Sequence, residues 1–223
     1  SNRNLAILAI LGDLKMSEII MLTNTRLSFP QLVEARAYQE GQAKKFSADL
    51  ILDPAGEDWK KVMHSVMQSA QEKWGDNAQA VLQMCQADRK LRAFGNGAEK
   101  VDKKTFKPYE GYEGAVYVSA NNANPPQMIE SNGKSVDPTN TMAYQALARK
   151  MYGGCYVNAA IKFWIQDNKY GRGIRCELIA LQFAKDGTPF GDAAPDASNL
   201  FGAVAAPAGG ATPAGMAFPS FLS

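Results

Sequence analysis

Two consecutive runs of alternating residues, 156–166 and 173–183, constrain the fold more than any other feature of the sequence. Successive side chains of a strand point to opposite faces, so these runs predict two long, half-buried strands. The six residues between them, 167–172, exceed a tight two-residue turn, and we expect a mobile basic loop there. Between Arg149 and Arg175 six Lys or Arg residues accompany one acid, Asp167. The sequence therefore predicts an antiparallel strand pair with a basic, aromatic surface.

Further strands are predicted at 23–29, 44–52, 115–120 and 127–130. Apolar residues from Trp59 to Trp74 recur at helical spacing, which predicts a long amphipathic helix that begins at Asp53-Pro54 and ends at Gly75. Shorter helices are expected at 78–85 and 138–149, and residues 86–112 form a polar, basic stretch. The fold class is mainly β with a helical insertion (α+β), and an OB-fold-like five-stranded barrel is the natural closure.

The 223 residues suffice for one domain with tails. We expect an N-terminal extension at 1–21, a folded domain at 22–191 and a disordered tail at 192–223, which is rich in Ala, Gly and Pro and from Ala193 onward carries Asp196 as its one charge. Met16-Ser17-Glu18 is typical of a natural start, so residues 1–15 are expected to be non-native. No apolar run approaches the ~20 residues of a membrane span, and three distant cysteines indicate reduced thiols. We expect a cytoplasmic protein.

The sequence contains few residues suited to catalysis or to metal binding. His64 is the one histidine, and neither a C-x-x-C pair nor a phosphate-binding loop is present. Asp49, Asp53, Glu57 and Asp58 are close in sequence and leave a metal-dependent nuclease open as an alternative, although Asp53 and Asp58 suit the start of a helix. We therefore expect no enzyme, no bound metal and no cofactor.

Interleaved rings and basic residues favour single-stranded nucleic acid, because flat rings stack on unpaired bases while basic side chains follow the phosphates. Lys162 and Trp164 share one face of the strand at 156–166, and Phe163 occupies the opposite, core face. Trp59 and Trp74 are also expected in the core. The predicted stacking residues are Tyr109, Tyr112, Tyr117, Tyr152, Tyr156 and Trp164. The predicted phosphate contacts are Lys44, Lys45, Arg92, Lys107, Arg149, Lys150, Lys162, Lys169 and Arg172.

With these residues laid out, the chain resembles the phage and prophage single-stranded DNA-binding proteins of OB fold. The resemblance covers roughly residues 22–191 and rests on three pieces. They are Thr25-Arg26-Leu27-Ser28-Phe29 with Lys45-Phe46-Ser47-Ala48; Tyr112-Glu113-Gly114-Ala115-Val116-Tyr117-Val118-Ser119-Ala120-Asn121 with Gln127-Met128-Ile129; and Tyr152-Gly153-Gly154-Cys155-Tyr156-Val157 with Phe163-Trp164, Gln182 and Asp186-Gly187-Thr188-Pro189-Phe190-Gly191. The chain departs from the family in a longer, more basic stretch at 95–108 and in a tail without acidic residues at its end.

The resemblance implies sequence-independent binding and protection of single-stranded DNA in phage DNA replication and recombination. Two alternatives stay open: a virion or assembly protein, which would show no salt-sensitive DNA binding, and a metal-dependent nuclease or recombination enzyme. The expected partner is single-stranded DNA. Phage or host replication and recombination proteins are candidate partners, a homodimer is a candidate assembly, and no membrane contact is expected.

Overall fold

The computed structural model describes residues 19–37, 39–169 and 171–191. Most of the expected N-terminal extension and the whole expected tail at 192–223 lie outside these residues. The first strand begins at Ile19, so residues 19–21 belong to the fold rather than to an extension. Within the described part of the chain, no helix is long and apolar enough to cross a membrane.

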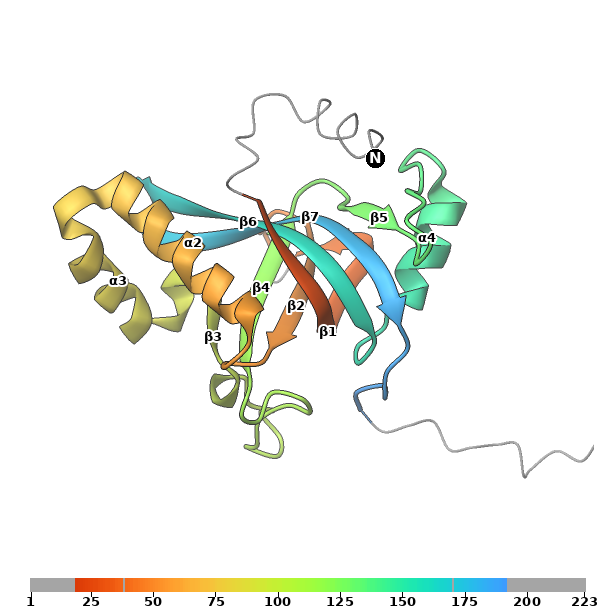
Figure 1. Ribbon diagram of the computed structural model, residues 1–223, viewed down its shortest axis with the longest axis horizontal. Coiled ribbons are helices and arrows are strands. Elements are labelled where there is room, and N and C mark those ends of the chain that lie inside the picture. The colour runs from red at the N-terminus through yellow and green to blue at the C-terminus, as the bar shows by residue number, and fades with distance from the viewer. Residues whose placement is uncertain (1–18, 38, 170, 192–223) are drawn as a thin grey trace, which may run out of the picture. The chain divides into compact units, whose positions relative to one another are not determined.

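Five strands close into a barrel, as the sequence predicts (Figure 1). The sheet order β4-β2-β1-β6-β7 is antiparallel throughout, and β4 and β7 close it by a parallel contact between Asn121 and Glu177. This order is that of an OB-fold-like barrel. The strands are β1 (Ile19–Arg36), β2 (Lys45–Leu52), β4 (Val116–Asn122), β6 (Tyr156–Asn168) and β7 (Gly171–Lys185).

Two short strands extend the barrel. The strand β3 (Phe94–Asn96) pairs with β4, and β5 (Gln127–Ile129) lies parallel to β7. The sequence predicts β5 but not β3, because three residues with a central glycine carry no measurable alternation. β3 therefore interrupts the stretch at 86–112 that was expected to be loop.

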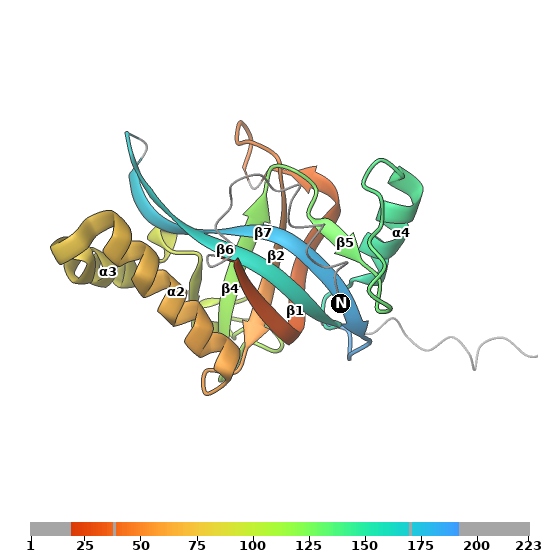
Figure 2. The same ribbon diagram turned by 45° about the horizontal axis from the view of Figure 1, so that its top comes forward.

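In the part of the chain that the structure describes, three α-helices flank the barrel: α2 (Glu57–Trp74), α3 (Ala78–Ala87) and α4 (Thr141–Lys150). Single 3₁₀ turns lie at Gly75–Asn77, Arg89–Leu91 and Gly97–Glu99. The helices α2 and α3 lie beside the tip of the β6–β7 hairpin, and α4 lies with β5 at the other end (Figure 1, Figure 2). The helix α2 ends at Gly75 as predicted, but it begins at Glu57 rather than Pro54. The reason is local: the Asp53 carboxylate accepts from the Ala55 backbone N–H at 2.9 Å and forms a turn instead of a helix cap.

The β6–β7 hairpin corrects one expectation. The two strands pair as far as Asn168 and Gly171, so only two residues connect them and the expected mobile loop at 167–172 is wrong. Asp167 ties the end of the hairpin to the helices: its carboxylate accepts from Trp74 Nε1 at 2.8 Å and pairs with Arg172 at 3.2 Å. The hydrogen bond from Trp74 contributes most to lowering the pKa of the Asp167 carboxyl, and the hydrogen bond from Arg172 lowers it further. Contacts with residues distant in sequence thus make a regular hairpin from a segment that is polar and basic.

The core fills the barrel and continues under α2. Phe163 is 3% exposed, which confirms its predicted place in the core. The Trp59 ring of α2 contacts Phe94, which in turn contacts Phe163, each pair at 6.2 Å between ring centres. Trp59 and Trp74 pack against this core while remaining partly exposed. The core therefore fixes which face of β6 is buried and which is free for a ligand.

Candidate nucleic-acid interface

The outer face of β6 brings three of the predicted residues into one row. Val157, Ile161 and Phe163 point into the core, so the even-numbered residues point outward. Both register shifts between β6 and β7 skip residues of β7, which leaves the alternation of β6 unbroken. Tyr156, Lys162 and Trp164 therefore share the outer face, over roughly 26 Å of strand at about 3.3 Å per residue.

Trp164 is the exposed ring of this row. It is 44% exposed and lies opposite Arg175 of β7, just as Lys162 lies opposite Glu177. The Arg175 guanidinium donates to Gln166 Oε1 at 2.8 Å and to the Lys90 carbonyl at 2.9 Å, which holds it beside the ring. A tryptophan mounted on a rigid strand next to a fixed cation is suited to stack on a base. We call the outward side chains of Lys162, Trp164 and Arg175 the hairpin face.

A second group of rings lies around the outer face of β1. Phe29 is 48% exposed, and its ring meets that of Tyr109 edge to face at 4.9 Å between centres. Phe190 lies beneath the Arg26 guanidinium at 4.3 Å, and Tyr156 contacts both Arg26 and Lys185. We call Arg26, Phe29, Tyr109, Tyr156 and Phe190 the aromatic face. Because Tyr156 also begins the outward row of β6, this strand joins the aromatic face to the hairpin face.

Arg26 is anchored rather than mobile. Its Nη2 donates to the Thr188 carbonyl at 2.8 Å and its Nε to the Gly154 carbonyl at 3.4 Å. The approach is close at Gly154 as well, where a Cβ would lie 2.1 Å from the Thr188 carbonyl oxygen. Gly154 and Gly187 therefore pack together only without side chains, and carbonyls of this region hold Arg26 and the Phe190 backbone in place.

The basic loop between β3 and β4 is folded back against the sheet. A buried carboxylate, Asp49 on the outer side of β2, accepts from Tyr112 at 2.7 Å and from Ser119 at 2.6 Å, and pairs with Lys100 Nζ at 2.7 Å. Burial and the neighbouring Asp49 charge raise the pKa of the Tyr112 hydroxyl, so this hydroxyl stays protonated as a donor. The network fixes the loop and leaves its tip, at Phe106 and Lys107, exposed.

Three predicted contacts are wrong because the side chains are buried. Tyr112 is fully buried and Tyr117 is 3% exposed, so neither ring can stack on a base. The Arg92 guanidinium is 8% exposed and makes a double hydrogen bond with Glu99, 2.9 Å for each nitrogen. It also donates to the Phe94 carbonyl at 2.7 Å, which leaves it no open side for a phosphate.

The other predicted residues are at the surface but do not all lie together. Lys44 and Lys45 are exposed at the start of β2, and Arg149 and Lys150 are exposed in the last turn of α4. The Lys150 ammonium lies 4.4 Å from the centre of the Phe183 ring. Tyr152 is half-buried, and its hydroxyl bonds to Gly187 and Asp186, so its ring is held in place. Lys169 and Arg172 are exposed at the hairpin tip.

Two openly displayed phenylalanines, Phe29 and Phe106, were not among the predicted stacking residues. Phe29 and Phe106 are 48% and 82% exposed, and both adopt positive φ angles, 45° and 55°. Arg26 and Arg175 were missed as well. The sequence did hold a signal for Arg26 and Phe29. The run Thr25-Arg26-Leu27-Ser28-Phe29 is part of the resemblance to the family, and it combines a basic and an aromatic residue, as the predicted contacts elsewhere in the chain do.

The acidic residues of the nuclease alternative are engaged elsewhere. Asp49 lies in the network with Tyr112 and Asp53 forms its turn, while Asp58 accepts from the Thr23 backbone N–H at 2.7 Å. Over residues 19–191, apart from positions 38 and 170, no three His, Cys, Asp or Glu side chains come together as a candidate metal site. This arrangement does not favour the nuclease alternative.

Comparisons with known proteins agree with the geometry. The model of a family described as the ssDNA-binding protein of Enterobacter phage Enc34 matches residues 18–209. A putative protein p50 of Acyrthosiphon pisum secondary endosymbiont phage 1 is 30% identical over 174 residues, which cover 77% of this chain and 85% of that protein.

Two solved structures are similar in fold. The single-stranded DNA-binding protein of bacteriophage Enc34 in complex with ssDNA superimposes with a TM-score of 0.62 at 24% identity, over 79% of this chain and 91% of that one. The same phage protein solved on its own gives a TM-score of 0.59 at 24% identity, over 83% and 90% of the two chains. At this identity the likeness shows the fold, which is the OB-fold-like barrel predicted from the sequence.

Proposed function

The chain belongs to the single-stranded DNA-binding protein family of Enterobacter phage Enc34, and on this premise we propose that it binds single-stranded DNA without regard to sequence. We place the strand along the outer face of β6, from the aromatic face to the hairpin face. The observation that carries this placement is the unbroken row of Tyr156, Lys162 and Trp164, with exposed or half-exposed rings at both ends and a lysine between them. Its span of roughly 26 Å fits the site sizes of several nucleotides per OB fold.

Two kinds of contact would share the binding energy. Bases stack on Trp164, Phe29 and Tyr109, at about 1–3 kcal/mol for each base, and the stacking is indifferent to sequence because every base has a flat face. Phosphates are met by exposed basic side chains, of which Lys44, Lys45, Lys107, Lys169 and Arg172 are our candidates. With a net charge of +2 the whole chain attracts DNA little, so the attraction depends on this local clustering.

The same arrangement explains a preference for single strands. Phe29 and Trp164 are mounted on strands rather than on flexible side loops, and they project outward from the barrel. A ring in this position can reach a base that is free to unstack, whereas the bases of a duplex are occupied by their partners. We therefore propose protection of exposed single strands, without catalysis, during phage DNA replication and recombination in the bacterial cytoplasm. Replication and recombination proteins remain candidate partners.

A titration of labelled oligo-dT at a series of salt concentrations tests the proposal. If several phosphates are contacted, log K falls linearly with log salt, with a slope of about 0.7 for each phosphate neutralised on a single strand. A double variant, Lys169→Ala with Arg172→Ala, should lower this slope, whereas the matched pair Lys103→Ala and Lys104→Ala on the loop tip tests whether that loop shares the path. An oligo-dT affinity that does not change with salt concentration would refute the proposal, and so would an equal affinity for a duplex of the same length. Either result would favour the virion-protein alternative.

A further inference from the structure

Two cations beside Tyr156 are held by rings rather than by carboxylates. Lys185 Nζ lies 4.7 Å from the centre of the Tyr156 ring, and the Arg26 guanidinium lies 5.9 Å from the same centre. The three residues lie side by side, because Tyr156 of β6 pairs with Arg26 of β1 and with Lys185 of β7. Among the residues that the structure describes, neither cation forms an ion pair with a carboxylate. We call Arg26 and Lys185 the ring-held cations.

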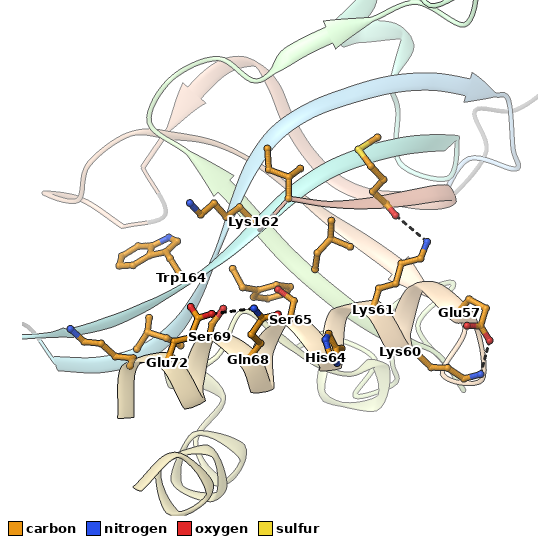
Figure 3. Close-up of a pocket in the computed structure, with 16 residues that line it drawn as sticks. Glu57, Lys60, Lys61, His64, Ser65, Gln68, Ser69, Glu72, Lys162 and Trp164 are labelled. Atoms are coloured by element: carbon orange, nitrogen blue, oxygen red, sulfur yellow. Dashed lines mark hydrogen bonds and ion pairs between the residues drawn. The ribbon is translucent and has the colours of Figure 1, made fainter. Parts of the chain in front are cut away.

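The basic side chains at the start of α2 differ from the ring-held cations. Lys60 is bonded to Glu57 at 2.6 Å, and Figure 3 shows this pair at the end of the helix that lies away from Trp164. Lys61 is paired with Asp58 at 2.7 Å. Such a lysine must share its charge between its own carboxylate and a phosphate, whereas the ring-held cations can give their full attraction to a phosphate.

The acidic residues of the adjoining segments form hydrogen bonds of their own. Asp186 accepts from the Tyr152 hydroxyl at 3.1 Å, and Glu110 accepts at 3.1 Å from a backbone N–H that follows β7. The Lys150 ammonium of α4 lies 4.4 Å from the centre of the Phe183 ring and adds a third cation near this end of β7. This end of the barrel therefore presents cations on rings, while its carboxylates are bonded to other groups.

The Tyr156 ring is fixed in place and already in contact with a cation. A Cβ at Gly187 would lie 2.9 Å from Tyr156 Cε2, so the chain after β7 packs closely against this ring. A base that stacked beneath Lys185 would have to displace its ammonium, whereas a phosphate is attracted by it. Arg26 is fixed as well, since its Nε and Nη2 donate to carbonyl oxygens, and this arrangement leaves Nη1 to donate to a phosphate.

We propose that Arg26, Tyr156 and Lys185 form a phosphate clamp, in which Tyr156 is a positioning residue that holds both cations and does not stack on a base. This inference rests on the proposed function, since the phosphate is that of the bound single strand. Cations held over a ring are ordered before the ligand arrives, which lowers the cost of binding. Along the path the clamp lies between Phe29 and Trp164. It holds the DNA backbone against the sheet there, while bases on either side reach these two rings.

The test measures the salt dependence of oligo-dT binding by the full chain, because this dependence reports neutralised phosphates. Lys185→Gln removes one cation of the clamp and should lower the slope of log K against log salt by about 0.7, the value for one phosphate on a single strand. Lys60→Gln is the matched control, since it removes one exposed charge away from the row and should leave the slope unchanged. An unchanged slope in Lys185→Gln, or an equal decrease in both variants, would overturn the proposal.

Variants of Tyr156 test its positioning role. Tyr156→Leu removes the ring without changing the charge and should lower the slope by about 0.7–1.4, for one or two phosphates, whereas Tyr156→Phe keeps the ring and should keep the slope of the parent. With Lys185→Gln added, Tyr156→Leu should have a smaller effect than alone, because both act on the same phosphate. If Tyr156→Leu lowers the affinity by the same factor at every salt concentration, the ring stacks on a base and the proposal is wrong. A thermal melt checks folding, and if Tyr156→Leu does not fold, the exposed Lys185 decides.

The parent protein separates failure of the clamp from failure of the proposed function. If the parent binds oligo-dT with a steep salt dependence and Lys185→Gln shows the same slope, the clamp is wrong and the proposed function stands. If the parent does not bind oligo-dT even at low salt, both are wrong. Trp164→Ala should lower the affinity with the slope unchanged, which distinguishes a stacking ring from the positioning ring of Tyr156.

Discussion

Trp164 and Phe163 are sequence neighbours with opposite surroundings, and this contrast gives a sharp test of the interface. Trp164 is 44% exposed and Phe163 is 3% exposed. Truncation of Trp164 to Ala should lower oligo-dT affinity by about 1–3 kcal/mol, which is about 5- to 150-fold in Kd. The same truncation should lower the free energy of unfolding by about 1–2 kcal/mol. This is less than a core truncation costs, because solvent fills the space and no cavity remains. Phe163→Ala should instead cost about 3–5 kcal/mol of stability.

The assay measures both quantities on each variant. Urea denaturation gives the free energy of unfolding, and anisotropy of a labelled oligo-dT, well below the melting temperature, gives the affinity. Trp164→Phe is the matched control, since it keeps a ring on the same backbone and should retain most of the affinity. DNA-induced quenching of tryptophan fluorescence should disappear in Trp164→Phe, because Trp59 and Trp74, the other two tryptophans, pack against the core.

The prediction is wrong if Trp164→Ala and Phe163→Ala do not differ in DNA affinity and in stability as described. Should Trp164→Ala fold normally and bind oligo-dT as the parent does, the hairpin face is not part of the interface. Binding would then have to centre on Phe29 and Tyr109. Should Trp164→Ala cost as much stability as Phe163→Ala, the ring is a structural element and its exposure is incidental.

Three further predictions address the loop, a buried thiol and backbone strain. Tyr112→Phe removes one hydrogen bond to the buried Asp49 carboxylate and should cost about 1.5–3 kcal/mol in urea denaturation, with oligo-dT affinity unchanged; a large loss of affinity would restore Tyr112 to the interface. Burial raises the pKa of the Cys155 thiol to about 11 from an ordinary 9.0. The stability that comes from keeping this thiol protonated in the folded state is therefore complete below pH 9 and declines as the pH rises to 11. The free energy of unfolding of Cys155→Ala, measured by denaturation, should fall less steeply over that range than that of the parent. Phe106→Gly relieves a positive φ of 55° and loses a ring that is 82% exposed, so stability should stay within about 1 kcal/mol while oligo-dT affinity falls if this ring stacks; unchanged affinity would leave Phe106 outside the interface.

Much of the barrel could be predicted from the sequence because its strands and its long helix are regular. The alternation along β6 predicts both the buried Phe163 and the outward Trp164, and regular pairing with β7 from Ile161 to Asn168 preserves it. The apolar spacing from Trp59 to Trp74 predicts α2 and its end at Gly75. These signals are local, and burial of one face is enough to fix them.

Loop side chains could not be placed in the same way, because their partners are distant in sequence. The hydroxyl of Tyr112 donates to Asp49, which lies 63 residues earlier in the sequence. Nothing in a run of lysines and tyrosines indicates that this loop folds back onto β2. Arg26 is held by the carbonyl of Thr188, 162 residues later. The composition of a basic, aromatic stretch is the same whether its rings face DNA or a sheet. Only closure of the barrel decides between these two roles.

Backbone strain separates the two roles more clearly than composition does. Positive φ costs a residue with a Cβ about 1–2 kcal/mol, and glycine adopts it without that cost. Asn24, Phe29 and Phe106 are the non-glycine residues at positive φ in the described ranges, and both phenylalanines among them have exposed rings. Around Phe106 the chain is held firmly, since its N–H donates to the Asp102 carbonyl at 2.8 Å and the Asp102 N–H donates to the Lys107 carbonyl at 2.9 Å. Glycine would meet the turn at Phe106 without this cost, and the Phe29 ring is only partly covered by its contact with Tyr109, so both rings stay exposed. We therefore propose both rings as candidates for stacking on unpaired bases, and the Phe106→Gly variant tests this for one of them.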